Sequence, residues 1–230
     1  QTVEDGFLTV RQLITYAAIT GGVGLAIGLY LVFVSERGEI TMALLVSGLF
    51  FVLFYTFPLK YIGLGEPAVL VVWGPLMVGG SYFVITGDWS NEVAFASLAY
   101  ALGPTAVLFG KHTDKLSFDS DKGIRTLPVL LGESLSRKVT VALLLAQYPV
   151  IGYLIYTGFF HPVMLISFAS MFSLKRVFEV FAHPRPERAP SSLPEGVWPL
   201  WFVGVTFWFT RRYSGFFLIG LVLDVILSRG

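Results

Sequence analysis

The sequence predicts an all-α fold, a polytopic bundle of transmembrane helices that forms one membrane domain over residues 1–230. Hydrophobic residues make up 55% of the chain and charged residues only 13%, whereas about 25% of an ordinary soluble domain is charged. The mean hydropathy of +0.73 leaves too few polar side chains to cover a surface that faces water. The apolar segments are continuous and do not alternate with period two, which excludes a transmembrane β-barrel.

Charge and composition exclude two further classes of function. The formal net charge is +1, so the chain lacks the basic footprint of a nucleic-acid-binding protein. It contains no cysteine, so disulfides and thiol chemistry are absent. The partner that the composition indicates is the lipid bilayer.

About seven apolar segments are expected to cross the membrane. At about 1.5 Å per residue, residues 12–34 are long enough for the ~30 Å hydrocarbon core of a bilayer. Their glycines favour close packing of helices. Pro58 ends the second segment because a proline interrupts a helix interior. In chain order, the expected spans are residues 12–34, 40–57, 67–86, 93–110, 139–157, 162–172 and 216–227.

The polar connections divide between the two sides of the membrane. The positive-inside rule, applied to lysines and arginines, places the turn at Lys60, the loop 111–136 and the basic, proline-rich linker 175–188 in the cytoplasm. The turns expected on the opposite side contain Glu36, Asp88 and His161.

Residues 198–209 form a short apolar segment followed by Arg211 and Arg212. A helix that crossed the membrane here would carry both arginines to the outer side, against the positive-inside rule. We therefore expect an interfacial or re-entrant helix over 198–209. The chain is expected to be integral to the plasma or inner membrane, with its polar loops in the cytoplasm.

The longest polar run, residues 111–128, contains Asp114, Asp119 and Asp121 and is expected to open on the same face as Lys60. Aspartate oxygens bind Mg²⁺, which usually keeps several waters and bridges to substrate phosphate. Lysine and arginine neutralise the remaining phosphate charge, and a pyrophosphate leaving group is stabilised as its charge develops. The apolar bundle would hold a long lipid chain. The alternative is a solvated charged loop that only follows the positive-inside rule.

Two segments of the chain resemble a known family. Residues 63–66, Gly-Leu-Gly-Glu, and residues 114–133, with Asp114, Asp119 and Gly-Ile-Arg-Thr-Leu, resemble the UbiA superfamily of intramembrane prenyltransferases. They are most similar to the branch that prenylates 1,4-dihydroxy-2-naphthoate in menaquinone biosynthesis. The tyrosine–lysine segment 55–60 and the segment 207–215 are also similar to family motifs.

The resemblance implies about nine transmembrane helices around a central cavity, in which a polyprenyl group passes from its diphosphate to an aromatic acceptor with Mg²⁺. It implies that Asp114 and Asp119 bind the Mg²⁺–diphosphate and that Lys60 and Arg125 contact phosphate. Tyr55 or Tyr61 would line the reaction centre. Further basic residues that it places near the substrate are Lys111, Lys115 and Lys122.

The chain departs from the family pattern in two ways. Asp114 and Asp119 are five residues apart where the family has four, and on a helix this changes their angular separation from about 40° to about 140°. Asp121 is therefore an alternative ligand. The family's earlier aspartate motif is missing, so the chain is expected to lack two helices and one of two Mg²⁺ sites, and to be inactive or severely impaired by itself.

Other functions remain open at this point. Within the superfamily, the acceptor could be a hydroxybenzoate, a glycerol phosphate or a porphyrin-type ring. A transporter would need charges deep in its spans, and Asp224 is the only acid deep in a late segment. A non-enzymatic membrane scaffold would need no paired polar loops on one face.

Overall fold

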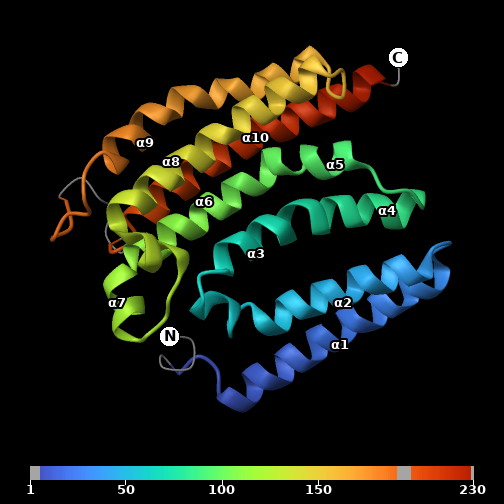
Figure 1. The fold of residues 1–230 in the computed structure, drawn as a ribbon, viewed down its shortest axis with the longest axis horizontal. Coiled ribbons are helices and arrows are strands. Elements are labelled where there is room, and N and C mark those ends of the chain that lie inside the picture. Colours follow the sequence, from blue (N-terminus) through green and yellow to red (C-terminus); the bar gives the residue numbers. More distant parts are fainter. Residues whose placement is uncertain (1–5, 191–197, 229–230) are drawn as a thin grey trace.

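The computed structural model describes residues 6–190 and 198–228. Within these ranges it is all-helical (Figure 1), which confirms the predicted fold class. Four helical segments in this part of the chain are long and apolar enough to cross a membrane, namely Val10–Val34, Gly65–Thr86, Asn91–Asp114 and Leu127–Tyr156; Gly38–Phe54 is apolar but shorter. The spans expected at 162–172 and 216–227 lie in helices that are not among these four.

The first two helices form an antiparallel hairpin at one side of the molecule (Figure 1). α1 (Val10–Val34) begins with a capping box, in which Thr9 and Gln12 each accept a hydrogen bond from the other's backbone N–H. α2 (Gly38–Phe54) packs on it where Gly28 meets Leu45. No residue of α1 is buried, so this hairpin presents most of its apolar surface to its surroundings.

The third apolar segment is one helical rod of three parts: α3 (Gly65–Val71), the π-helical η2 (Val72–Gly79) and α4 (Gly80–Thr86). Pro75 has no backbone N–H to donate, and Gly74 has non-helical dihedral angles, which together explain why the regular α-helix is interrupted. A Cβ atom on Gly74 would lie 3.0 Å from the Ala101 Cβ. The interruption therefore lets this rod approach the next helix closely.

The core lies among the remaining long helices. α5 (Asn91–Ala96) leads into α6 (Leu98–Asp114), and α6 packs against α8 (Leu127–Tyr156) and α10 (Phe202–Ser228). The short α7 (Leu116–Asp121) follows α6, while η3 (Pro162–Ser173) and α9 (Leu174–Phe181) pack along α10.

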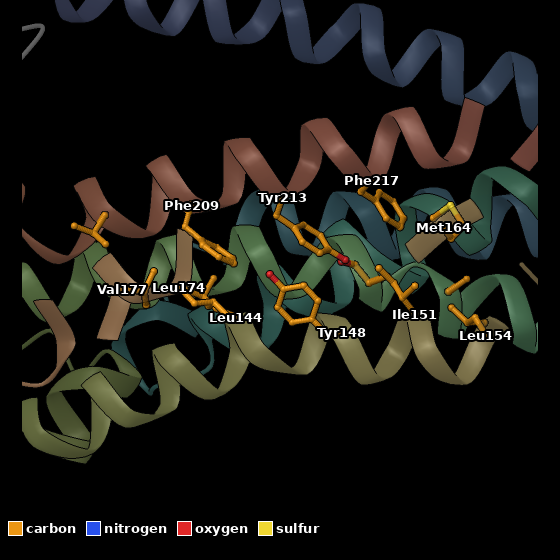
Figure 2. Packing of buried hydrophobic residues seen from close by; sticks show 14 of the residues in the cluster. Leu144, Tyr148, Ile151, Leu154, Met164, Leu174, Val177, Phe209, Tyr213 and Phe217 are labelled. Atoms are coloured by element: carbon orange, nitrogen blue, oxygen red, sulfur yellow. The ribbon is translucent and has the colours of Figure 1, made fainter. Parts of the chain in front are cut away.

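Aromatic side chains dominate this core, and Figure 2 shows Tyr148 of α8 and Tyr213 of α10 at its centre. Their rings meet edge to face at 5.8 Å, and Tyr213 stacks on Phe217. Each buried hydroxyl is satisfied, since Tyr148 pairs with Ser170 at 2.7 Å and Tyr213 donates to the Ala99 carbonyl at 2.8 Å. The phenols thereby join α6, α8, α10 and η3, and both of their hydroxyls are paired.

Gly110 lets α6 and α10 approach closely, and Gly110→Ala is expected to destabilise the protein by about 1–3 kcal/mol through overpacking. A Cβ atom there would lie 2.9 Å from Thr206 Oγ1 and 3.1 Å from the Val203 Cα, which is backbone that cannot swing away. Thermal unfolding in detergent measures the change. Gly22→Ala is the control, because nothing lies within 4 Å of a Cβ at Gly22. Equal melting temperatures for the two variants would contradict the close approach.

Two expected boundaries are wrong in the C-terminal part. The interfacial helix expected over 198–209 is not separate from the last span, because α10 runs unbroken from Phe202 to Ser228 through Arg211 and Arg212. Tyr213, fully buried between them and the last apolar run, anchors the helix across this point. The linker expected from residue 175 is also shorter, since α9 continues to Phe181.

Candidate active site

Three segments meet at one end of the bundle, which we call the loop end: the turn around η1 (Leu59–Tyr61), the α6–α7 junction, and the loop 122–126. The expected loop 111–136 is thus largely helical. Ile62 and Arg125 form an isolated parallel β-bridge that holds the first and third segments side by side. Gly63 makes this approach possible, because it has a φ of +78° and a Cβ atom there would lie 2.6 Å from the Leu130 side chain.

Glu66, at the start of α3, is the buried junction of the loop end. One of its carboxylate oxygens lies 2.6 Å from His112 Nδ1 on α6, and the other accepts the Leu127 backbone N–H of α8 at 3.3 Å. Glu66 and His112 are 1% and 2% exposed. One side chain therefore joins the three helices that carry the three loop-end segments.

Asp119 and Lys60 lie beside one another at the loop end. Lys60 Nζ lies 3.9 Å from Asp119 Oδ1, and the Asp119 carboxylate is almost completely buried. The other oxygen, Oδ2, has no hydrogen-bond partner among the described residues. Lys111 is near enough to interact electrostatically with Lys60, Lys115 and Asp119. A buried carboxylate with one oxygen that lacks a partner, beside the Lys60 ammonium group and near Lys111, fits a cation and a polyanion bound together.

Asp114, which is predicted to bind metal, lies against the start of the last helix. Its two carboxylate oxygens accept the backbone N–H groups of Phe202 and Val203, each at 2.9 Å, at the start of α10. Arg185 donates to the Asp114 backbone carbonyl. A carboxylate at a helix N-terminus satisfies donors that have no partner within the helix.

The aspartates expected to bind metal are therefore not equivalent. Asp114 is occupied as a helix cap, Asp119 faces Lys60, and Asp121 is exposed at the end of α7. In residues 6–190 and 198–228, no group of three or more histidine, aspartate or glutamate side chains is placed to hold a metal ion. Asp119 Oδ2 is the atom in this region that lacks a partner and fits a divalent cation.

The remaining predicted residues lie around the mouth of the site. Tyr61 and Arg125 line a hollow of about 480 Å³ with Gly123 and Leu130. Lys115 and Lys122 are exposed, and Lys122 Nζ lies 4.2 Å from the centre of the Phe118 ring. Lys115 and Lys122 are thus the outermost of the predicted cations, and the structure does not bring them onto Asp119.

Tyr55 connects the loop end to a large apolar cleft. Its carbonyl accepts the Lys60 backbone N–H at 3.0 Å, and its side chain lines the cleft.

The cleft lies between the α1–α2 hairpin and the α3–α4 rod and has a volume of about 1060 Å³. Its walls are almost entirely apolar, and small residues widen it on both sides. The glycines that line it are Gly21, Gly24, Gly28, Gly48 and Gly80. A cleft of this kind suits a long, flexible hydrocarbon chain.

Sequence reasoning missed the pairing of Glu66 with His112. Glu66 belongs to the polar segment that follows Lys60 and His112 to the polar run 111–128, but the two residues are 46 positions apart. The signal that was available is a histidine and a glutamate beside long apolar segments, where a buried charge needs a partner. This signal identifies the two residues, but it does not show that they pair with each other.

Comparison with known proteins identifies relatives. Residues 2–203 match the UbiA prenyltransferase family. The chain is 30% identical to UbiA prenyltransferase domain-containing protein 1 of Danio rerio over 151 residues, which cover 64% of this chain and 45% of that protein. It is 30% identical to the homolog of Drosophila melanogaster over 153 residues, covering 64% and 42%. No solved structure shows a significant match.

The protein of Xenopus tropicalis is 27% identical over 184 residues, covering 77% of this chain and 53% of the relative. The chain therefore spans about half the length of the curated relatives it matches. Their names specify a prenyltransferase domain and no acceptor, so they do not single out the expected naphthoate branch. The family match covers most of the sequence, from the first helix through the buried Asp119 to the start of α10, and the chain belongs to the UbiA prenyltransferase family.

Proposed function

We propose that the loop end transfers a polyprenyl group from its diphosphate to an aromatic acceptor in a quinone biosynthetic pathway. The observation that carries the proposal is the buried Asp119 carboxylate, which faces Lys60 with one oxygen and has no hydrogen-bond partner on the other. Lys60 is bonded through its backbone to Tyr55, at the edge of the apolar cleft. A charged head group and a hydrocarbon chain thus have adjacent sites.

The reaction requires stabilisation of a leaving group. The bond between the first prenyl carbon and the diphosphate oxygen breaks, and pyrophosphate leaves with the electron pair. A ring carbon of the acceptor forms the new bond to the prenyl carbon and then loses its proton. Lys60, Lys111 and Arg125 would contact the phosphates, where fixed positive charge favours the developing negative charge.

Asp119 is the residue that would hold Mg²⁺, and Asp121, exposed at the end of the same helix α7, is not assigned to the ion. Mg²⁺ is commonly held by one or two carboxylates together with substrate phosphates and water, so a single open carboxylate oxygen is compatible with it. When bound, the ion would neutralise phosphate charge and orient the diphosphate. Asp114 would affect this site indirectly, because it holds the end of α6, which leads into α7 and Asp119, against the start of α10.

Removal of Mg²⁺ is expected to weaken binding of a prenyl thiodiphosphate at least about tenfold, because the Asp119 carboxylate and the diphosphate repel one another unless a divalent cation lies between them. Titration calorimetry of the detergent-solubilised chain, with Mg²⁺ and after EDTA treatment, measures the change. Binding is the direct readout of the site, because it does not depend on turnover. Equal affinity in EDTA would exclude a metal-dependent site, and restoration by added Mg²⁺ is the control.

The acceptor class is the least constrained part of the proposal. A naphthoate-type acceptor is supported by the resemblance of residues 114–133 to the menaquinone branch. Another acceptor of the superfamily is the second candidate, since the relatives' names specify none. Product analysis with 1,4-dihydroxy-2-naphthoate and hydroxybenzoate offered in parallel distinguishes them. We also propose that the loop end faces the cytoplasm, in line with the basic residues gathered there.

A further inference from the structure

The outer face of α9 and α10 carries a cationic and aromatic cluster that the proposed transfer reaction does not use. Arg176 of α9 and Arg212 of α10 both approach Trp208, with guanidinium carbons 5.3 Å and 4.2 Å from the ring centre. Both arginines are exposed. Neither makes an ion pair within 4.0 Å among residues 6–190 and 198–228.

Two like charges meet on one indole without a carboxylate between them. Each guanidinium gains a cation–π interaction with the ring, but their mutual repulsion is left uncompensated by the side chains that the structure describes. Both guanidinium groups lie beside the same ring, and a pair of neighbouring arginines can hold a phosphate by several hydrogen bonds. The cluster therefore fits an anion with several acceptor oxygens.

The position of the cluster, near the loop end of the bundle, favours a lipid as the source of that anion. α10 begins at Phe202, whose ring meets Phe181 at 4.9 Å, and Arg137 donates to the Phe181 carbonyl. These contacts mark the loop end of the bundle. Trp208 lies roughly 9 Å further along α10 at about 1.5 Å per residue, within two helical turns of the loop end, and basic amphipathic segments bind at the boundary between headgroups and acyl chains.

α9 has the character of an interfacial segment at this level. Its residues Leu174, Val177 and Phe181 are buried against the core, while Lys175 and Arg176 are exposed. A polar face rich in lysine and arginine beside an apolar face is typical of helices that lie at a membrane surface. Tryptophan is likewise enriched at that boundary.

Apolar side chains continue the same faces toward the middle of the membrane. Phe172 precedes Arg176 by one helical turn and is 91% exposed, and Ile219 follows Arg212 by two turns and is 48% exposed. Acyl chains would lie along these side chains while the headgroup meets the arginines. Inorganic phosphate has no acyl chain, so these apolar side chains would not stabilise its binding.

We propose that Arg176, Trp208 and Arg212 form a binding site for the phosphate of an anionic phospholipid. The guanidinium groups hold the phosphate oxygens, the indole orients both arginines, and the acyl chains pack on the exposed apolar residues of η3 and α10. The proposal is independent of the prenyl transfer reaction, because α9 and this part of α10 carry none of the residues assigned to the diphosphate.

Native mass spectrometry of the chain, released from nanodiscs of phosphatidylglycerol and phosphatidylcholine in equal amounts, tests the proposal. The wild-type chain should retain phosphatidylglycerol in preference, and the double variant Arg176→Gln/Arg212→Gln should retain about tenfold less of it, since each cation near an anionic surface contributes appreciably. The control Lys138→Gln/Arg188→Gln removes two other exposed cations and should retain as much as the wild type.

Three outcomes would overturn the proposal. Equal retention of phosphatidylglycerol by the arginine variant and the control would mean that the arginines do not hold the lipid. Complete displacement of the lipid by millimolar inorganic phosphate would indicate a site for free anions. A wild-type dimer that the arginine variant dissociates, with no change in bound lipid, would make this face a contact between two copies of the chain. The melting temperature of each variant shows whether it is folded.

Discussion

Asp119→Asn is expected to weaken Mg²⁺-dependent binding of a prenyl thiodiphosphate by about 100-fold, the upper end of the effect of losing one partner around a metal. The substitution keeps the shape of the side chain and removes its charge. It takes away the partner of Lys60 and the open oxygen that we assign to the cation. Prenyl transfer in an active preparation should fall by a similar factor, because the leaving group loses the same stabilisation.

Asp121→Asn is the matched control for this experiment. Asp121 lies on the same short helix, but it is exposed, so its loss should change binding by less than about twofold. Calorimetry gives both affinities, and thermal unfolding shows whether each variant keeps its fold. If Asp121→Asn causes the large loss and Asp119→Asn does not, the assignment passes to Asp121. If neither variant changes binding, the loop end is not the diphosphate site.

Glu66→Ala is expected to lower the free energy of unfolding by about 3 kcal/mol, because each buried polar group left without a partner costs about 1–3 kcal/mol. The variant leaves both His112 Nδ1 and the Leu127 N–H unpaired in a region closed to water. The segments bridged by Ile62 and Arg125 should then separate more easily. Diphosphate affinity is therefore expected to fall together with stability.

Glu187→Ala provides the comparison, since Glu187 is an exposed glutamate in the connection after α9. Its free energy of unfolding should match that of the wild type within about 0.5 kcal/mol. Limited proteolysis at the loop end is a second measurement, and Glu66→Ala should be cleaved faster there. A Glu66→Ala protein that is as stable and as resistant to cleavage as Glu187→Ala would show that the junction contributes little.

The helical fold and most of its spans could be predicted because they depend on composition and length alone. Continuous apolar runs identified the segments that became α1, α2, the α3–α4 rod, α6 and α8. The continuity of α10 could not be read in the same way, because Arg211 and Arg212 interrupt the apolar pattern. Tyr213, which follows the two arginines, is buried by its contacts with α6 and α8, and these tertiary contacts cannot be read from the local sequence.

The site could be predicted where charge chemistry decides it. Lys60 and the polar run 111–128 were expected to open on the same face, because the lysines and arginines of the loops follow the positive-inside rule. The contact between Lys60 and Asp119 was not predicted and is seen only in the structure. The role of Asp114 could not be predicted, because its partners lie 88 and 89 positions further along the chain. Local spacing gives an angle around a helix, and only the tertiary fold decides which neighbour satisfies the side chain.

The Asp114 cap has a consequence for anyone who redesigns the C-terminal region. Its carboxylate is held by two backbone N–H groups of α10, so removal of that helix would leave a charge in the interior with no donors. The chain would then have to protonate Asp114 or expose the end of α6, from which Asp119 follows directly. Shortened or fused versions of this protein should therefore keep the sequence from Phe202 onward, even though no catalytic role is assigned to it.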